Sequence, residues 1–354
     1  MLTQGERRSL MGMGIVIVTL HVVGWGVLAG IVAPHSFRIG SGQVFGIGLG
    51  LTAYALGMRH AFDADHIAAI DNTSRKLMSD HQRALSVGFW FSLGHSSIVF
   101  LLAALLALGV RALADPVANE SSALQHVTHV VGAAVSGTFL YLIGILNLVI
   151  LIGIVRAFRR MRHEVLSDDA LEAQLVNRGV LNRVLAGAMR TVRKPWQMYP
   201  IGLAFGFGFD TATEVSLLVL AGGAAAFSIP WYAVLTLPIL FAAGMSLLDT
   251  IDGCFMNVAY GWASSTPVRK IFYNLTVTGV SVAVALIIGS IQLMSLVADR
   301  LGLTHGPLAY LASLDLAAVG LIIALGFVGI WVLGLVVWRF GRIEQRWAST
   351  SPAD

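Results

Sequence analysis

Apolar runs long enough to cross a lipid bilayer recur along almost the whole chain, and they constrain its fold more than any single motif. A membrane-spanning helix needs about 20 predominantly apolar residues, because the hydrocarbon core of a bilayer is about 30 Å thick. Hydrophobic residues make up 56% of this chain and charged residues only 12%, about half of the charged content of a typical soluble domain. The sequence therefore predicts an all-α polytopic membrane protein.

Eight such runs are interpreted as transmembrane helices. They cover approximately residues 9–33, 43–71, 84–110, 128–155, 198–225, 229–260, 270–297 and 314–340. The chain thus divides into a first half (1–155), a polar loop (156–197), a second half (198–341) and a C-terminal tail (342–354). We expect the loop to be a solvated hairpin of two short helices, with Asp169 and Glu172 in a capping box and Gly179 at a helix end.

The basic residues predict the orientation in the membrane. Lys and Arg gather at both termini and in alternate loops, including Arg75, Lys76 and Arg83 after the second run, whereas the loops on the other side carry only Arg38, Arg111 and Arg300. By the positive-inside rule, both termini then lie in the cytoplasm and the protein spans the cytoplasmic membrane. The net charge of +4 reflects this topology, with anionic lipid headgroups as a secondary partner and no role for nucleic acid.

Several runs are too long or too interrupted for plain helices. The second would measure about 43 Å at 1.5 Å per residue, so that it tilts, breaks or extends into the cytoplasm. The fifth opens with Gly202, Gly206 and Gly208, and the sixth contains Pro230, Pro238 and Gly244. Broken helices are common near the ion sites of secondary transporters, although glycines also let intact helices pack closely.

The second run contains the segment Arg59–Ile67, in which two histidines and two aspartates fall within seven residues. Ionisable residues at membrane depth mark ion or proton pathways. On a continuous helix His60, Asp63 and His66 would lie within about 120° of one another, whereas Asp65 would point away. Either the helix is irregular there, or Asp65 orients a metal ligand from behind. We interpret the segment as a metal-ion site.

Three other clusters accompany the first, in the third, fifth and sixth runs. Their candidate ligands are His95, Asp210, Glu214, Asp249 and Asp252. Asp210 and Glu214 form one pair of carboxylates, and Asp249 and Asp252 form another. Such pairs would repel each other strongly if buried without compensation, and the only obvious internal cation, Arg59, is at the edge of the first motif. A bound divalent cation, or protonation, must supply the missing charge. His126 and His129, near the loop 111–127, are more typical of ordinary surface histidines than of metal ligands at the entrance.

These residues resemble the nickel/cobalt transporter family (NiCoT). The family's His-x4-Asp-His signature corresponds to His60, Asp65 and His66, and its further motifs resemble residues 93–96, 208–214 and 244–252. The resemblance extends over nearly the whole chain, without a departure at the motif positions. It implies a permease of eight helices with cytoplasmic termini that imports Ni²⁺ or Co²⁺.

The residue types support that function independently. Imidazole and carboxylate ligands suit borderline divalent ions, and the single cysteine, Cys254, excludes a thiolate cluster within one chain. No phosphate-binding Gly-x-x-x-x-Gly-Lys-Ser/Thr loop is present, so we expect a secondary transporter without an ATPase subunit. We expect no enzymatic activity and no resident cofactor, because the metal is the cargo.

Two kinds of alternative remain open. Ligands do not reveal direction, so the chain is also compatible with a metal efflux carrier, or with a proton-coupled carrier of another solute. An intramembrane metallohydrolase is disfavoured because the helical His-Glu-x-x-His pattern is absent.

Overall fold

A computed structural model of the chain describes residues 3–39, 43–80, 82–108, 122–161, 192–207, 229–263, 267–303, 305–307, 310, 314 and 316–341. Almost all of these residues are helical. The principal helices are α1 (Gln4–Val27), α3 (Ile47–His60), α4 (Ala64–Ser79), α5 (Val87–Ala107), α7 (Ala123–Met161), α11 (Met198–Gly206), α13 (Trp231–Val234), α14 (Thr236–Ala263), α15 (Pro267–Arg300) and α17 (Leu316–Gly341). A π-helical turn (Leu28–Val32) and α2 (Ala33–His35) prolong α1, and two short antiparallel strands, β1 (Arg38–Ile39) and β2 (Gln43–Val44), follow it.

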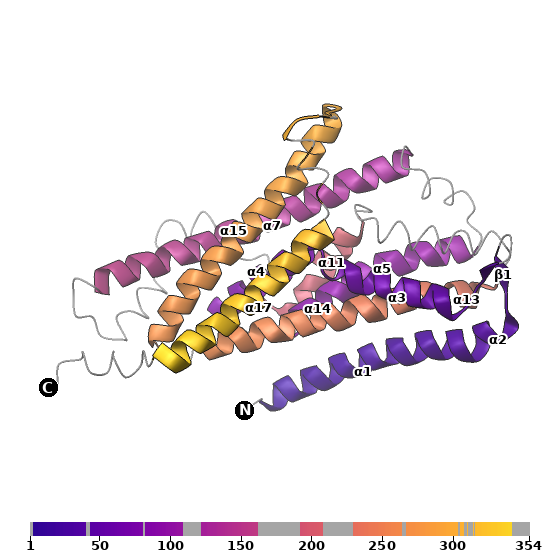
Figure 1. Cartoon of the computed structure of the whole chain (residues 1–354), viewed down its shortest axis with the longest axis horizontal. Coiled ribbons are helices and arrows are strands. Elements are labelled where there is room, and N and C mark those ends of the chain that lie inside the picture. Colours follow the sequence, from indigo (N-terminus) through magenta and orange to yellow (C-terminus); the bar gives the residue numbers. More distant parts are fainter. Residues whose placement is uncertain are drawn as a thin grey trace.

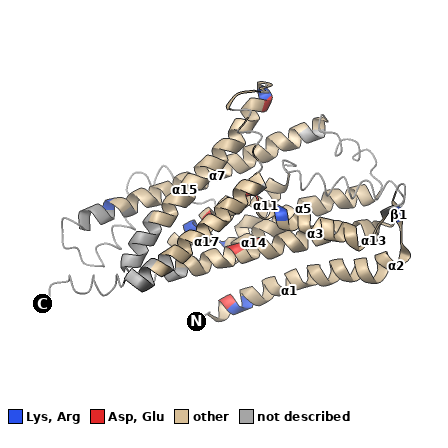
Figure 2. Ribbon diagram, in the orientation of Figure 1, with Lys and Arg blue, Asp and Glu red and all other residues tan. Residues whose placement is uncertain are grey.

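The long helices form a bundle of membrane-spanning dimensions (Figure 1). Within the described parts of the chain, five segments are long and apolar enough to cross a membrane. They are Gln4–His35, Val87–Ala107, His126–Gly153, Trp231–Tyr260 and Thr276–Arg300, and a shorter apolar segment covers Ala318–Leu333. Charged residues are sparse along the bundle and lie mainly near helix ends, as at the start of α1 and the end of α15 (Figure 2). The chain is thus an all-α, multi-pass membrane protein.

The second apolar run is broken into two helices. A break was one of the three possibilities that its length left open, beside a tilt and an extension. Helix α3 ends at His60 and α4 begins at Ala64, with a tight turn in which the amides of Phe62 and Asp63 bond to the carbonyls of Arg59 and His60. Helix α4 continues beyond residue 71, the expected end of the apolar run, to Ser79.

Helix α4 lies at the centre of the molecule. All its residues from Ala64 to Leu77 are buried, because α5, α7, α14, α15 and α17 all pack against it. Arg75 and Lys76 therefore belong to a buried helix and not to a loop, and the inference that the only internal cation is near the first motif is wrong. Both side chains are buried in α4, and Arg59 is exposed.

The described glycines of the fifth and sixth runs serve close packing. A Cβ on Gly202 would lie 2.0 Å from the Phe91 carbonyl oxygen of α5, and one on Gly244 would lie 2.6 Å from the Tyr54 oxygen of α3. Helix α14 runs unbroken through Pro238 and Gly244, since proline is tolerated in the first turn of a helix. Helix α11 includes Gly202 and ends at Gly206.

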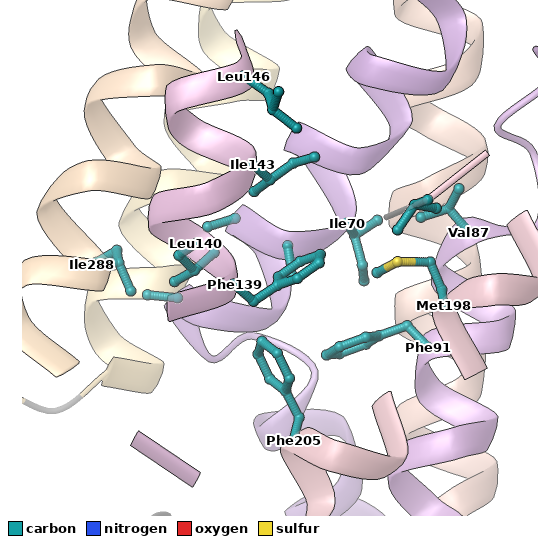
Figure 3. Close-up of a cluster of buried hydrophobic side chains, with 14 of the residues drawn as sticks. Ile70, Val87, Phe91, Phe139, Leu140, Ile143, Leu146, Met198, Phe205 and Ile288 are labelled. Carbon is teal, nitrogen blue, oxygen red and sulfur yellow. The ribbon is translucent and has the colours of Figure 1, made fainter. Parts of the chain in front are cut away.

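An apolar cluster joins α4, α5, α7, α11 and α15 on one side of the central helix. Figure 3 shows Phe91, Phe139 and Phe205 within it, and the Phe205 ring lies edge-on to both other rings at centroid distances of 5.1 and 5.9 Å. The Phe91 ring also lies edge-on to His66, 4.8 Å away. This packing fixes one wall of the space that the histidine rings occupy.

The predicted loop hairpin, with Asp169, Glu172 and Gly179, lies outside the described residues. So does all of the fifth run beyond Phe207.

Candidate metal centre

The break between α3 and α4 brings the first motif together. His60 is the last residue of α3, Asp63 is the N-cap of α4, and His66 is in its first turn. All three side chains are at most 2% exposed. The break rests against α17 at Gly320, where a Cβ would lie 1.7 Å from the Phe62 carbonyl oxygen. Only glycine lets α17 approach the turn so closely.

His95 of α5 completes a group of three buried histidines. The ring centroids of His60, His66 and His95 are 4.6 to 4.8 Å apart, and one ring nitrogen of each lies within 4.8 Å of the others. Among the described residues, this is the only such group of three potential metal ligands. Three converging imidazoles suit a borderline divalent cation.

Asp63 orients His60. Its Oδ2 lies 2.7 Å from His60 Nδ1, and the carboxylate makes no side-chain cap to α4, although aspartate is a favoured capping residue. A hydrogen bond donated by Nδ1 leaves the lone pair of His60 on Nε2, which faces His95 Nε2 at 2.9 Å. A hydrogen bond at this distance requires a proton on one of the two nitrogens, and a cation that binds both must displace that proton.

Asp65 lies outside the histidine group. The sequence had left open whether the helix is irregular at this point or whether Asp65 orients a metal ligand from behind. The break in the helix accounts for the irregularity, and the Asp65 carboxylate points toward α7 and α15. It accepts hydrogen bonds from Ser136 Oγ at 3.1 Å and from Gln292 Nε2 at 3.4 Å, and its Oδ1 accepts from the His66 amide at 3.0 Å. Asp65 therefore anchors the first turn of α4, and with it the backbone of His66.

Asp249 of α14 lies beside His66 of the histidine group. Its Oδ2 lies 3.5 Å from His66 Nδ1, within ion-pair range, and neither of its buried oxygens has a hydrogen-bond partner among the described residues. Such a buried carboxylate is costly unless charge or a hydrogen bond compensates it. Asp252, one turn further along α14, is partly buried. Its Oδ2 also lacks a hydrogen-bond partner in the described structure.

The remaining candidate ligands contribute no described contact to the group. Asp210 and Glu214 lie outside the described residues. His126 is exposed, and His129 pairs with Asp299 of α15 at 3.4 Å, where both side chains are partly exposed. This agrees with the interpretation of His126 and His129 as surface histidines.

Sequence reasoning missed Ser136 and Gln292. Both are buried polar residues in otherwise apolar helices. A buried polar side chain in an apolar helix requires a hydrogen-bond partner, and that requirement was the available signal.

A bundle of apolar helices that encloses three convergent imidazoles and a line of carboxylates defines a multi-pass membrane protein equipped to handle a transition-metal cation. The family comparison specifies the class further. Residues 46–337 match the NicO family, described as high-affinity nickel-transport protein, and the chain belongs to that family. It is a member of a transporter family and not an enzyme, which removes the hydrolase alternative.

Proteins named as nickel or cobalt transporters are similar to most of this chain. The nickel transporter NicT of Mycobacterium tuberculosis is 57% identical over 98% of this chain and 93% of its own length. The nickel transporter NixA of Staphylococcus aureus is 42% identical over 98% of both chains. The cobalt transport protein NhlF of Rhodococcus rhodochrous is 41% identical over 84% of this chain and 82% of its own. No solved structure matches the chain.

Proposed function

We propose that this protein imports Ni²⁺, Co²⁺ or both across the cytoplasmic membrane as a secondary transporter of eight transmembrane helices with both termini in the cytoplasm. The observation that carries the proposal is the buried group of His60, His66 and His95. The relatives named above, two of nickel and one of cobalt, support the substrate class.

The cation exchanges its hydration water for the three imidazoles, which are neutral ligands. Asp249 supplies negative charge beside His66, and Asp63 and Asp65 orient His60 and the first turn of α4 from behind. Carboxylates behind metal-binding histidines fix the ring orientation and raise the basicity of the ligand. Asp252, Asp210 and Glu214 complete the candidate acidic set.

The membrane potential supplies enough energy for uptake without ATP. Moving a double positive charge into a negative interior gains about 4.6 kcal/mol per 100 mV, equivalent to a concentration ratio of more than three orders of magnitude. The proton between His60 and His95 gives a second possibility, in which each bound metal ion displaces a proton.

The test is uptake of radioactive nickel and cobalt at nanomolar concentrations in cells that carry the parent, His66→Ala or His126→Ala. We expect the parent and His126→Ala to accumulate metal and His66→Ala to lose accumulation. Competition between the two metals then identifies the preferred ion. Equal accumulation in all strains would remove the histidine group from the mechanism, and lower accumulation with the parent than with His66→Ala would indicate efflux.

Proteoliposomes separate the sources of energy. Uptake driven by an inside-negative potassium diffusion potential at equal pH on both sides is the expected result. Uptake that requires a pH gradient would instead show proton coupling, and transport of another solute that survives metal chelation would favour the proton-coupled carrier.

A further inference from the structure

A second buried polar cluster lies along α4, beyond the histidine group. Its members are Asp71 and Arg75 of α4, Tyr260 of α14 and Thr278 of α15, all of them buried. From His66, α4 advances about 7.5 Å to Asp71 and about 6 Å more to Arg75, at 1.5 Å per residue. The cluster therefore lies further along the axis of α4 than the histidine group, toward the C-terminal end of this helix.

Arg75 is held at several points. Its Nη1 donates to Thr278 Oγ1 at 2.9 Å and its Nη2 donates to the Tyr260 hydroxyl. Nη2 also lies 3.5 Å from Asp71 Oδ1, and the guanidinium carbon lies 4.2 Å above the centre of the Tyr260 ring. The Tyr260 hydroxyl in turn donates to Asp71 Oδ1. Arginine suits such a site, because its planar group satisfies several partners at once.

Asp71 is only half satisfied by these contacts. Asp71 has no exposed surface, and its second oxygen, Oδ2, makes no hydrogen bond to any described residue. The long 3.5 Å approach of Arg75 leaves this oxygen available to another positive partner.

An acidic row connects this cluster to the histidine group. Asp249 faces His66, and Asp252 lies three residues further along α14, next to Gly253, where a Cβ would lie 3.8 Å from Ile70 of α4, the neighbour of Asp71. The described oxygens of this row include four that are buried without a hydrogen-bond partner, on Asp71, Asp249 and Asp252. Helices α4 and α14 run in the same direction, since His66 meets Asp249 and Arg75 meets Tyr260. The row thus follows the interface of these two helices, with Arg75 as its one described cation.

We propose that the transported cation leaves the histidine group along Asp249, Asp252 and Asp71, and that Arg75 is a tethered cationic gate at the end of this row. Without metal, the Arg75 charge compensates Asp71 and closes the path. An arriving cation takes over the Asp71 carboxylate, while Arg75 keeps its bonds to Thr278 and Tyr260. Renewed pairing of Arg75 with Asp71 then expels the metal. This inference rests on the proposed function, because it gives the histidine group an exit.

The first test is the number of metal ions bound per purified full-length chain, measured with Co²⁺ and Ni²⁺ by equilibrium dialysis. We expect the parent to bind about one ion and Arg75→Gln to bind about two, because carboxylates freed from their cation become ligands for a divalent ion. The combined variant Asp71→Asn/Arg75→Gln should return to about one ion. Arg83→Gln is the matched control and should behave as the parent, because Arg83 pairs with Glu6 and its side chain is 60% exposed.

The second test guards against failure of Arg75→Gln to fold. Removing one member of a buried ion pair is strongly destabilising, whereas replacing both with neutral groups is often tolerated, so the combined variant is the safer protein. Its maximal uptake rate should fall by about tenfold or more, the effect on rate of about one charge-assisted hydrogen bond. Its KM should stay close to that of the parent, because the histidine group is intact.

The outcomes separate the two proposals. A single bound ion in Arg75→Gln, or parental uptake by the combined variant, would overturn the gate and leave the histidine site standing. A parent that binds no metal, with no effect of His66→Ala on uptake, would overturn the proposed function itself.

Discussion

Replacing Asp63 by Asn should weaken metal binding without touching a proposed imidazole ligand. Asp63 Oδ2 accepts from His60 Nδ1 at 2.7 Å, and these side chains are 2% and 1% exposed. A hydrogen bond to a charged group contributes about 1.5–3 kcal/mol, and removal of a partner behind a metal-binding histidine typically reduces affinity about 10- to 100-fold. The Asn side chain preserves the size of the site but removes the negative charge that favours the required tautomer of His60.

The assay is the initial rate of radioactive nickel uptake as a function of concentration, at matched protein levels. The KM for nickel should rise about 10- to 100-fold, with the maximal rate changed much less. Asp299→Asn is the control, because that carboxylate is 46% exposed and pairs only with a surface histidine among its described contacts. An unchanged KM, or a fall in the maximal rate alone, would refute the orienting role of Asp63.

Three further outcomes follow from the packing. Gly202→Leu should abolish uptake and lower the thermal unfolding temperature in detergent, because even a Cβ would lie 2.0 Å from the Phe91 carbonyl oxygen. Ser136→Ala should destabilise the fold by about 1–3 kcal/mol, measured by thermal unfolding, because the buried Asp65 loses a donor at 3.1 Å. His129→Ala should change neither uptake nor stability measurably, because its ion pair is partly exposed and such pairs contribute about 0–1 kcal/mol.

Each of these outcomes has a control or a contradicting result. Gly153→Leu is the counterpart of Gly202→Leu, since no atom lies within 4 Å of a Cβ at Gly153, and equal loss in both would exclude the helix contact as the cause. Unchanged stability of Ser136→Ala would mean that Asp65 is satisfied without Ser136. A tenfold loss of uptake in His129→Ala would reinstate an entrance site at the start of α7.

The sequence identified the membrane class and the histidine motif for a clear physical reason. Long apolar runs and ionisable residues inside them are both local features of a chain. The break at residues 61–63 was only one of three possibilities, because Ala61 and Phe62 contain no helix-breaking signal. The turn is stabilised by the local bond from His60 to Asp63 together with a distant contact, the close approach of Gly320 in α17.

The sequence did not reveal the burial of the two cations of α4, Arg75 and Lys76, for a related reason. The polar sequence after residue 70 resembles a loop when hydropathy alone is considered. Arg75 is buried because Tyr260 and Thr278, about 200 positions further along the chain, satisfy its guanidinium. No local pattern contains that information. The placement of Asp249 beside His66 likewise depends on how α14 packs against α4.

The complete enclosure of α4 has a consequence for how the protein is made. In a lone helix, each of Asp65, Asp71 and Arg75 would cost about 2.5–3.5 kcal/mol at the centre of the bilayer. Their partners include Ser136 on α7, Tyr260 on α14 and Thr278 on α15, which leave the ribosome later. Helix α4 therefore cannot settle in the bilayer at the moment of its synthesis. It must wait at the membrane surface or in the insertion machinery until the second half of the chain arrives, which makes nascent chains cut short before α15 natural targets for quality-control proteolysis.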